Sequence, residues 1–164
     1  LPLGKVEILK AAHQLDGGSV LSVESVKILN SAKSSVDKLH QGEQFVLEVT
    51  VKFLTALKNI SIGFLIKDQF GQELTGESIF NTYRHSLDFQ AGQQAKFGFS
   101  SSMMFRGGQS YSVALRINQV SLWDRSDNVL IYIDELAAVF EVLSDIDNPM
   151  WFKFKQNFEI TIDG

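Results

Sequence analysis

The segment QFVLEVTVKF, residues 44–53, decides the fold class because apolar and polar residues alternate through most of its length. Every second position is apolar, and these positions are Phe45, Leu47, Val49, Val51 and Phe53. Successive side chains of a β-strand point to opposite faces, so this period of two is typical of a strand with one buried and one solvent-facing side. The segment therefore predicts a sheet that covers a core with one of its faces.

Similar patterns recur along the rest of the chain. Further strands are expected within residues 6–9, 23–29, 60–66, 72–80, 95–99, 111–117, 130–142 and 151–162. Residues 68–71 (DQFG) are a turn signal that joins two of these strands in a hairpin. We expect an irregularity near residues 134–136, and short helical turns at residues 32–39 and 134–139.

The predicted strands are separated by clusters of Gly, Asn, Asp and Ser, and helical periodicity is nearly absent. Parallel strands need crossover segments, usually helical, so this arrangement favours antiparallel pairing. The predicted fold class is all-β: an antiparallel Ig-like or jelly-roll-like β-sandwich of eight or nine strands. It forms one domain over residues 1–164, in which residues 1–5 are expected to be the cut edge of a longer protein.

The amino-acid composition argues against several classes of function. The chain is 45% apolar and 21% charged, with a net charge of −4, which is typical of a globular domain and argues against nucleic acid as a partner. It contains no cysteine, which excludes disulfides, thiolate catalysis and zinc–thiolate sites. The apolar runs are too short to cross a bilayer, so direct membrane insertion is not expected.

The motifs that carry common enzyme chemistry are missing. The sequence lacks a Gly-x-Ser-x-Gly nucleophile elbow and the Gly-x-x-x-x-Gly-Lys-Ser/Thr phosphate loop of an ATPase. His13, His40 and His85 are far apart in sequence, so no metal site or cofactor is predicted. Asp134 and Glu135 would point to opposite faces of a strand, which does not suit a glycosidase carboxylate pair. We expect a protein without catalytic activity.

Three places combine aromatic rings with planar polar groups, the pairing that sugar recognition needs. They are residues 81–85, which contain Tyr83 and Arg84; the outward row of residues 112–118, which contains Ser112, Arg116 and Asn118; and the loop that contains Trp123. Each residue also has a structural interpretation. Tyr83 could cap the core, Arg116 could be a solvated strand residue, and Trp123 could cover a sheet edge.

Two motifs resemble a known family. Residues 63–82 follow the pattern G-F-x-I-x-D-x-x-G-x-x-L-x-G and then N-T, and residues 133–142 follow the pattern D…A-x-F-x-V. Both are similar to the C-terminal carbohydrate-binding domain of Wzt-type ABC transporter subunits, which export O-antigen polysaccharide. In the family the Asn-Thr pair follows the second glycine more closely, whereas here residues 77–80 intervene.

The resemblance implies a sandwich that recognises the completed end of the polysaccharide and forms a dimer by exchange of a C-terminal strand. It implies a separate N-terminal ATPase domain, which this chain does not contain, and membrane subunits as further partners. It places the protein in the cytoplasm, at the inner face of the bacterial inner membrane. Residues 150–164, an aromatic-rich strand after the turn at 145–149, could be exchanged or could pair within their own chain.

The resulting hypothesis is noncatalytic binding of the terminal part of a bacterial O-antigen, coupled to export. Trp123 and Tyr83 would stack on sugar rings, and the polar contacts would come from Arg116, Asn118, Arg84 and Ser112. An anionic terminal group would suit the arginines. The alternatives are an Ig-like protein-interaction module, either an adaptor or an adhesin fragment, and a glycan-active enzyme whose carboxylates meet only in the folded chain.

Overall fold

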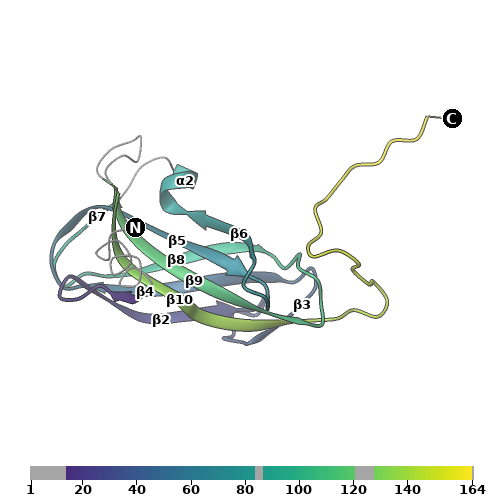
Figure 1. Cartoon of the computed structure of the whole chain (residues 1–164), viewed down its shortest axis with the longest axis horizontal. Helices are drawn as coiled ribbons and strands as arrows, with labels where there is room; N and C mark the ends of the chain where they lie inside the picture. Colours follow the sequence, from purple (N-terminus) through teal and green to yellow (C-terminus); the bar gives the residue numbers. More distant parts are fainter. Residues whose placement is uncertain (1–13, 84–86, 121–127, 164) are drawn as a thin grey trace, which may run out of the picture.

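A computed structural model describes residues 14–83, 87–120 and 128–163. The described strands form two sheets that face each other, as Figure 1 shows. The smaller sheet has the order β2-β4-β8, with β2 at Leu21–Leu29, β4 at Gln44–Phe53 and β8 at Gln94–Ser102. All its pairs are antiparallel, and β4 is the strand predicted from the alternating segment.

The larger sheet has the order β1-β10-β9-β5-β6. Its members are β1 (Gln14–Asp16), β5 (Leu57–Lys67), β6 (Glu73–Ser78), β9 (Gln109–Val120) and β10 (Asn128–Leu143). Two short strands complete it: β3 (Lys38–His40) pairs parallel with β10, and β7 (Leu87–Phe89) pairs antiparallel with β5. The strands β6 and β7 therefore share one edge of β5, joined through the short helix α2 (Ile79–Tyr83).

The core lies between the two sheets and is built from the inward residues of alternating strands. Val49 and Val51 on β4 and Leu115 on β9 are fully buried. An aromatic row crosses the core, in which Tyr111 stacks on both Phe105 and Phe140, with ring centroids 5.0 and 5.6 Å apart. Burial of these side chains is the main source of the fold's stability, at roughly 1.5–3 kcal/mol for each large residue.

The β5–β6 hairpin has the turn that the sequence predicts. Asp68 is buried, and its Oδ1 accepts hydrogen bonds from the backbone N–H groups of Phe70 and Gln72, both at 2.9 Å. Gly71 has a φ of 81°, in the left-handed region that favours glycine. This turn fixes the register of β6 against β5, and β6 in turn forms one wall of the groove described below.

The sandwich fold and the irregularity near residues 134–136 are confirmed. The register between β9 and β10 shifts between Asp134 and Ala138, where the strand bulges. Both predicted helical turns are wrong: residues 134–139 continue β10, and within residues 32–39 the chain forms an isolated bridge, Leu29 to Ser35, and then enters β3. The conformation of both stretches is set by their pairing with other segments of the chain, and a local sequence pattern does not reveal that pairing.

The predicted strand at residues 6–9 lies outside the described residues. The predicted strand at residues 151–162 is not formed within the single chain, where the described part of this segment has one isolated bridge, between Phe105 and Phe154. Figure 1 shows the end of the chain leaving the sandwich as an extended trace. The apolar residues Phe158, Ile160 and Ile162, which would have been buried in such a strand, are exposed instead.

Candidate functional site

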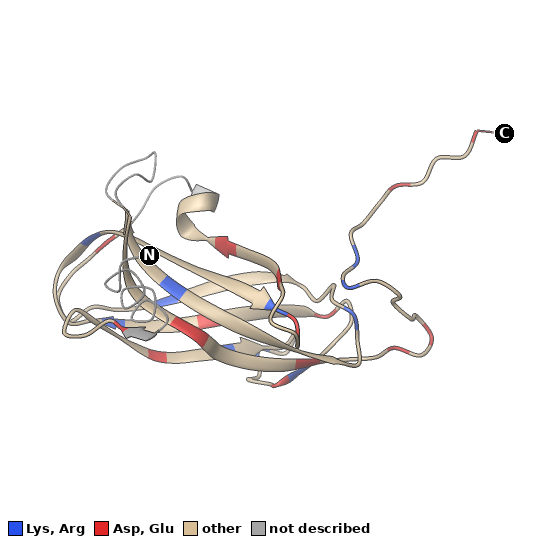
Figure 2. Cartoon of the chain, in the orientation of Figure 1, with Lys and Arg blue, Asp and Glu red and all other residues tan. Residues whose placement is uncertain are grey.

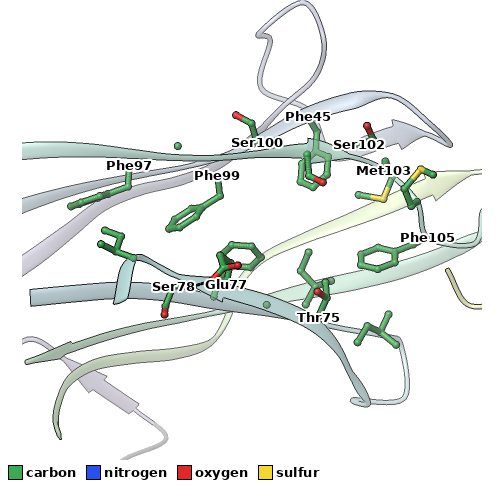
Figure 3. Close-up of a pocket in the computed structure, with 18 of the residues that line it drawn as sticks. Phe45, Thr75, Glu77, Ser78, Phe97, Phe99, Ser100, Ser102, Met103 and Phe105 are labelled. Carbon is green, nitrogen blue, oxygen red and sulfur yellow. Dashed lines mark hydrogen bonds between the residues drawn. The ribbon is translucent and has the colours of Figure 1, made fainter. Parts of the chain in front are cut away.

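A groove opens between the two sheets where β6 and β8 form their outer edges among the described strands. Its cavity volume is about 1130 Å³. Figure 3 shows Phe97 and Phe99 of β8 on one side, and Thr75, Glu77 and Ser78 of β6 on the other. Ligand pockets usually measure about 300–1,000 Å³, so the groove is large enough to accommodate a ligand.

The groove is lined mainly by phenylalanine. Phe97 and Phe99 face inward from β8, opposite Val49 and Leu47 in the register of the smaller sheet. Phe99 packs edge-on against Phe64 of β5, with ring centroids 4.9 Å apart, and Phe97 packs against Phe89 of β7 at 5.9 Å. Each ring is therefore held by an aromatic neighbour, which fixes its orientation toward the groove.

Polar side chains stand at the rim of this aromatic surface. Thr75 and Glu77 are exposed on β6, and Ser100 to Ser102 line the groove from β8. Glu77 Oε1 accepts a hydrogen bond from the N–H of Ser78 at 2.9 Å, which orients the carboxylate. Aromatic rings beside hydroxyl and carboxylate acceptors can stack on the apolar face of a sugar and bind its hydroxyl groups.

One end of the groove is formed by two segments far apart in the sequence. Met103, Met104 and Phe105 line it, together with Phe154 from the C-terminal part of the chain. The two segments are joined by backbone hydrogen bonds, from Arg106 N–H to Lys153 O at 2.9 Å and from Lys155 N–H to Met104 O at 2.7 Å. The groove thus has a wall that comes from outside the sandwich strands.

Three of the residues predicted to bind sugar lie outside this groove. Ser112, Arg116 and Asn118 share the outer face of β9, away from the groove, as the alternation predicts. Asn118 Nδ2 donates to Asn128 Oδ1 at 2.8 Å. Ala114, in the middle of the row, is buried and lies opposite Leu65 of β5. The row is therefore not one continuous open surface.

The remaining predicted residues cannot be placed as side chains. Tyr83 ends the helix α2, and the structure describes only its backbone. Arg84 and Trp123 lie outside the described residues. Of the predicted set, Ser112, Arg116 and Asn118 are thus brought together on one strand, and their assignment to a glycan site remains a prediction.

Arg116 is part of a charged cluster on the outer face. Its Nη2 lies 3.4 Å from Glu135 Oε1, while Lys67 Nζ pairs with Glu135 Oε2. The hydrogen bond from Lys67 lowers the pKa of Glu135; burial opposes it, and the charges of Lys67 and Arg116 add to the lowering. The Nε of Arg116 is buried without a hydrogen-bond partner among the described residues. Among the described residues, two cations thus lie around one carboxylate.

Charge is otherwise dispersed over the described surface. Figure 2 shows acidic and basic residues interspersed along the strands, with no large face of one sign in that view. The described residues contain no group of three or more His, Cys, Asp or Glu side chains that could hold a metal ion. They also contain no helix that is long and apolar enough to cross a membrane.

Sequence reasoning assigned the groove phenylalanines to the core. Phe45, Phe64, Phe97 and Phe99 alternate with polar residues as core residues do, and they are in fact only partly buried. The excess of phenylalanine, 13 residues, was the available signal for a second role. Alternation cannot separate a ring that fills the core from one that lines an opening at the sheet edge.

The family model for the Wzt C-terminal domain matches residues 14–154, most of the chain. This chain belongs to the Wzt C-terminal domain family. A solved structure titled "Crystal structure of the C-terminal domain of wzt" superimposes on this Wzt domain with a TM-score of 0.77 and 17% sequence identity, covering 90% of this chain and 86% of that one. At this identity the superposition establishes the shared fold.

A second solved structure is a β-glucosidase from Listeria innocua in complex with gluconolactone. It has a TM-score of 0.39 and 16% identity, and covers 76% of this chain and 16% of that one. A TM-score this low does not establish a shared fold. No curated protein matches the sequence.

Family membership confirms the resemblance that the two motifs indicate, and it supports a role in an O-antigen ABC transporter. The Wzt C-terminal domain is a noncatalytic part of that transporter. Family membership also accounts for the fold, because the solved Wzt domain superimposes on most of this chain.

Proposed function

We propose that this Wzt domain binds the terminal part of an O-antigen polysaccharide in the groove between its sheets, and thereby couples the finished glycan to export by the ABC transporter. The observation that carries the proposal is the groove itself, with its partly exposed phenylalanine rings and its polar rim on β6 and β8. Sugars present an apolar ring face surrounded by hydroxyl groups, and the groove offers a matching partner for each.

The outer row of β9 is a second proposed contact surface. Arg116 supplies a guanidinium on a side chain that is 40% exposed, and it shares Glu135 with Lys67. Because two cations share one carboxylate there, this surface suits an anionic group on the glycan. Asn118 and Ser112 would add neutral hydrogen bonds from the same strand, and the predicted roles of Tyr83, Arg84 and Trp123 belong to the same proposal.

Titration of the domain with a defined glycan tests the proposal and separates the two surfaces. The probe is the O-polysaccharide released from the lipopolysaccharide of the strain that encodes this chain, and binding is measured by calorimetry. If the groove holds the glycan, the double variant Thr75→Ala/Glu77→Gln loses about tenfold in affinity, because hydrogen bonds to a charged acceptor contribute about 1.5–3 kcal/mol. Both residues are exposed, so the fold tolerates their replacement.

Two further variants complete the experiment. Glu24→Gln, an exposed carboxylate on β2 away from the groove, is the matched control and keeps wild-type affinity. Arg116→Ala weakens binding if the outer row contacts the glycan, and an unchanged affinity removes Arg116 from the site. Absence of any binding by the wild-type domain contradicts the proposed function and favours the protein-interaction alternative.

The transport context extends the proposal to partners. We propose that the domain acts beside an ATPase domain and membrane subunits of the transporter, at the cytoplasmic face of the inner membrane. We also propose a homodimer, in which residues 156–163 of one copy pair with a sheet edge of another. The exposed, alternating Phe158, Ile160 and Ile162 support this, since such a segment gains burial by joining a sheet.

A further inference from the structure

The C-terminal part of the chain contributes one side chain to the groove. Phe154 lies beside Met103, Met104 and Phe105 at the groove's end, and it is 49% exposed. It is the member of the described lining that follows β10 in the chain. Its ring is therefore held by different interactions from those that hold the phenylalanines of β5, β7 and β8.

Phe154 is the middle residue of a short segment, residues 153–155, which we call the clip. The backbone of the clip holds the Phe154 ring in place. The clip forms an antiparallel bridge with Phe105, closed by the hydrogen bonds from Arg106 N–H to Lys153 O and from Lys155 N–H to Met104 O. Lys153 also reaches the β5–β6 turn, where its Nζ pairs with Gln72 Oε1 and lies 3.7 Å from Asp68 Oδ2. The clip thus spans from the edge of one sheet to the turn of the other.

The segment that receives the clip is itself anchored. Met103 exchanges backbone hydrogen bonds with the β3–β4 turn, through Gly42 N–H to Met103 O at 2.7 Å and Met103 N–H to Glu43 O at 2.8 Å. Tyr111 Oη donates to Arg106 O at 2.6 Å. Met103 and Phe105 of the receiving segment are buried in the core, whereas the clip is held by two backbone hydrogen bonds, one exposed lysine and the half-buried ring of Phe154. The clip is therefore the more readily detached of the two.

We infer that the clip is a detachable end wall of the glycan groove, and that Phe154 is a glycan-contacting residue whose presence depends on the clip being seated. The inference rests on the proposed function, because it assigns the glycan to this groove. Seating of the clip and binding of the glycan are then linked: the factor by which a seated clip raises the affinity for the glycan equals the factor by which bound glycan raises the equilibrium constant for seating. The chain segment that follows the clip would thereby influence how tightly the glycan is held.

Calorimetric titration of the full 164-residue chain with the same O-polysaccharide tests the inference. Phe154→Ala keeps the clip's backbone hydrogen bonds and removes the ring, and it is expected to weaken binding about tenfold, the loss of one aromatic stacking contact. Lys153→Met loosens the clip and is expected to weaken binding about threefold. Phe152→Ala is the matched control, since Phe152 is exposed in the same segment but does not line the groove.

The exchange rates of the amide hydrogens in the clip's two backbone hydrogen bonds distinguish a clip that responds to the glycan from one with a purely structural role. Addition of the polysaccharide to the wild-type chain should slow exchange of the Arg106 and Lys155 amides, because the bound glycan keeps the clip seated. If the wild type binds but Phe154→Ala and Phe152→Ala match it, or if those two amides exchange at unchanged rates, the inference is overturned and the proposed function stands. If the wild type does not bind, the proposed function fails and the inference fails with it.

Discussion

Glu135 is the residue on which the outer face of the larger sheet depends electrostatically. Its carboxylate forms an ion pair with Lys67 and lies within ion-pair distance of Arg116, and the Glu135 side chain is 28% exposed. Removal of the carboxylate would leave two half-buried cations side by side. Ion pairs with partly buried members cost more to break than exposed ones, because the remaining charges lose compensation.

The pKa of Glu135 makes this contribution pH-dependent. Because the pKa is held below its ordinary value of 4.5, the carboxylate stabilises the fold above that pH, and the stabilisation is lost as the pH falls through the lowered value. Glu135→Gln is expected to lower the free energy of unfolding by about 1–2 kcal/mol at pH 7. Denaturant unfolding should show this difference from wild type shrinking as the pH falls from 5 toward 3.

The exposed carboxylate of Glu24 provides the comparison for that measurement. Glu24→Gln should unfold with nearly the wild-type free energy at pH 7, since exposed charges contribute little. A Glu135→Gln variant that is as stable as Glu24→Gln across the whole pH range would contradict the role given to the cluster.

At the scale of the element, β6 is positioned by two glycines. A Cβ at Gly76 would lie 2.3 Å from the carbonyl oxygen of Phe64, and one at Gly63 would lie 2.8 Å from Ser78 Cβ. The close approach of β6 to β5 therefore depends on the absence of these side chains. The two glycines occupy different strands but set the same spacing, and that spacing positions the groove wall.

Gly76→Ala is expected to push β6 away from β5, because the contact at 2.3 Å is with backbone and cannot be relieved by a side-chain rotation. We expect a loss of about 1–3 kcal/mol in the free energy of unfolding and a weaker affinity for the polysaccharide. The control is Gly98→Ala on β8, where the nearest atom, Val46 Cγ1, is 3.4 Å from the added Cβ. Equal stability of the two variants would show that β6 is not held in this way.

The strands also show which parts of the fold can be predicted from the sequence. Alternation places β4, the β5–β6 hairpin and β9, because each has one face toward the core and bounding turns of its own. The strand predicted at residues 72–80 is too long, since it ends at Ser78 and α2 begins at Ile79. Alternation does not find β3, since that strand depends on a pairing partner distant in the chain. For residues 134–139 it predicts the observed strand with its irregularity, but also a helical turn that does not form. The groove was likewise hidden, because Phe97 and Phe99 have a core-like pattern and the opening beside them is a property of two sheet edges.

At the scale of the whole molecule, the end of the chain remains without a place in the sandwich. Phe158, Ile160 and Ile162 are 80, 84 and 89% exposed, and they alternate with polar residues as an edge strand would. Exposed apolar positions with this period favour association with a sheet edge. The single-chain structure is thus consistent with a larger assembly.

Ile160→Asp is expected to weaken that assembly, because a charge would have to enter the buried face of the exchanged strand. Size-exclusion chromatography with light scattering should show a wild-type mass near twice 18.3 kDa and a variant mass near the single chain. Leu54→Asp is the matched control, since Leu54 is 44% exposed in the loop after β4, at the opposite end of that strand from its pairing with Ser102 and the segment that contacts the C-terminal residues. A wild-type chain that is monomeric at all concentrations would contradict the dimer.

The position of the groove at the seam between the two sheets has a consequence for divergence. The rings at the floor of the groove also pack against the core; they are Phe64, Phe97 and Phe99. Replacement of one of them would therefore change the stability of the fold as well as the proposed binding of the glycan. The rim residues Thr75, Glu77 and Ser101 are exposed, so they line the groove without also packing in the core. Under the proposed function, adaptation of this scaffold to a different surface sugar would therefore change the rim residues and leave the aromatic residues of the floor nearly unchanged.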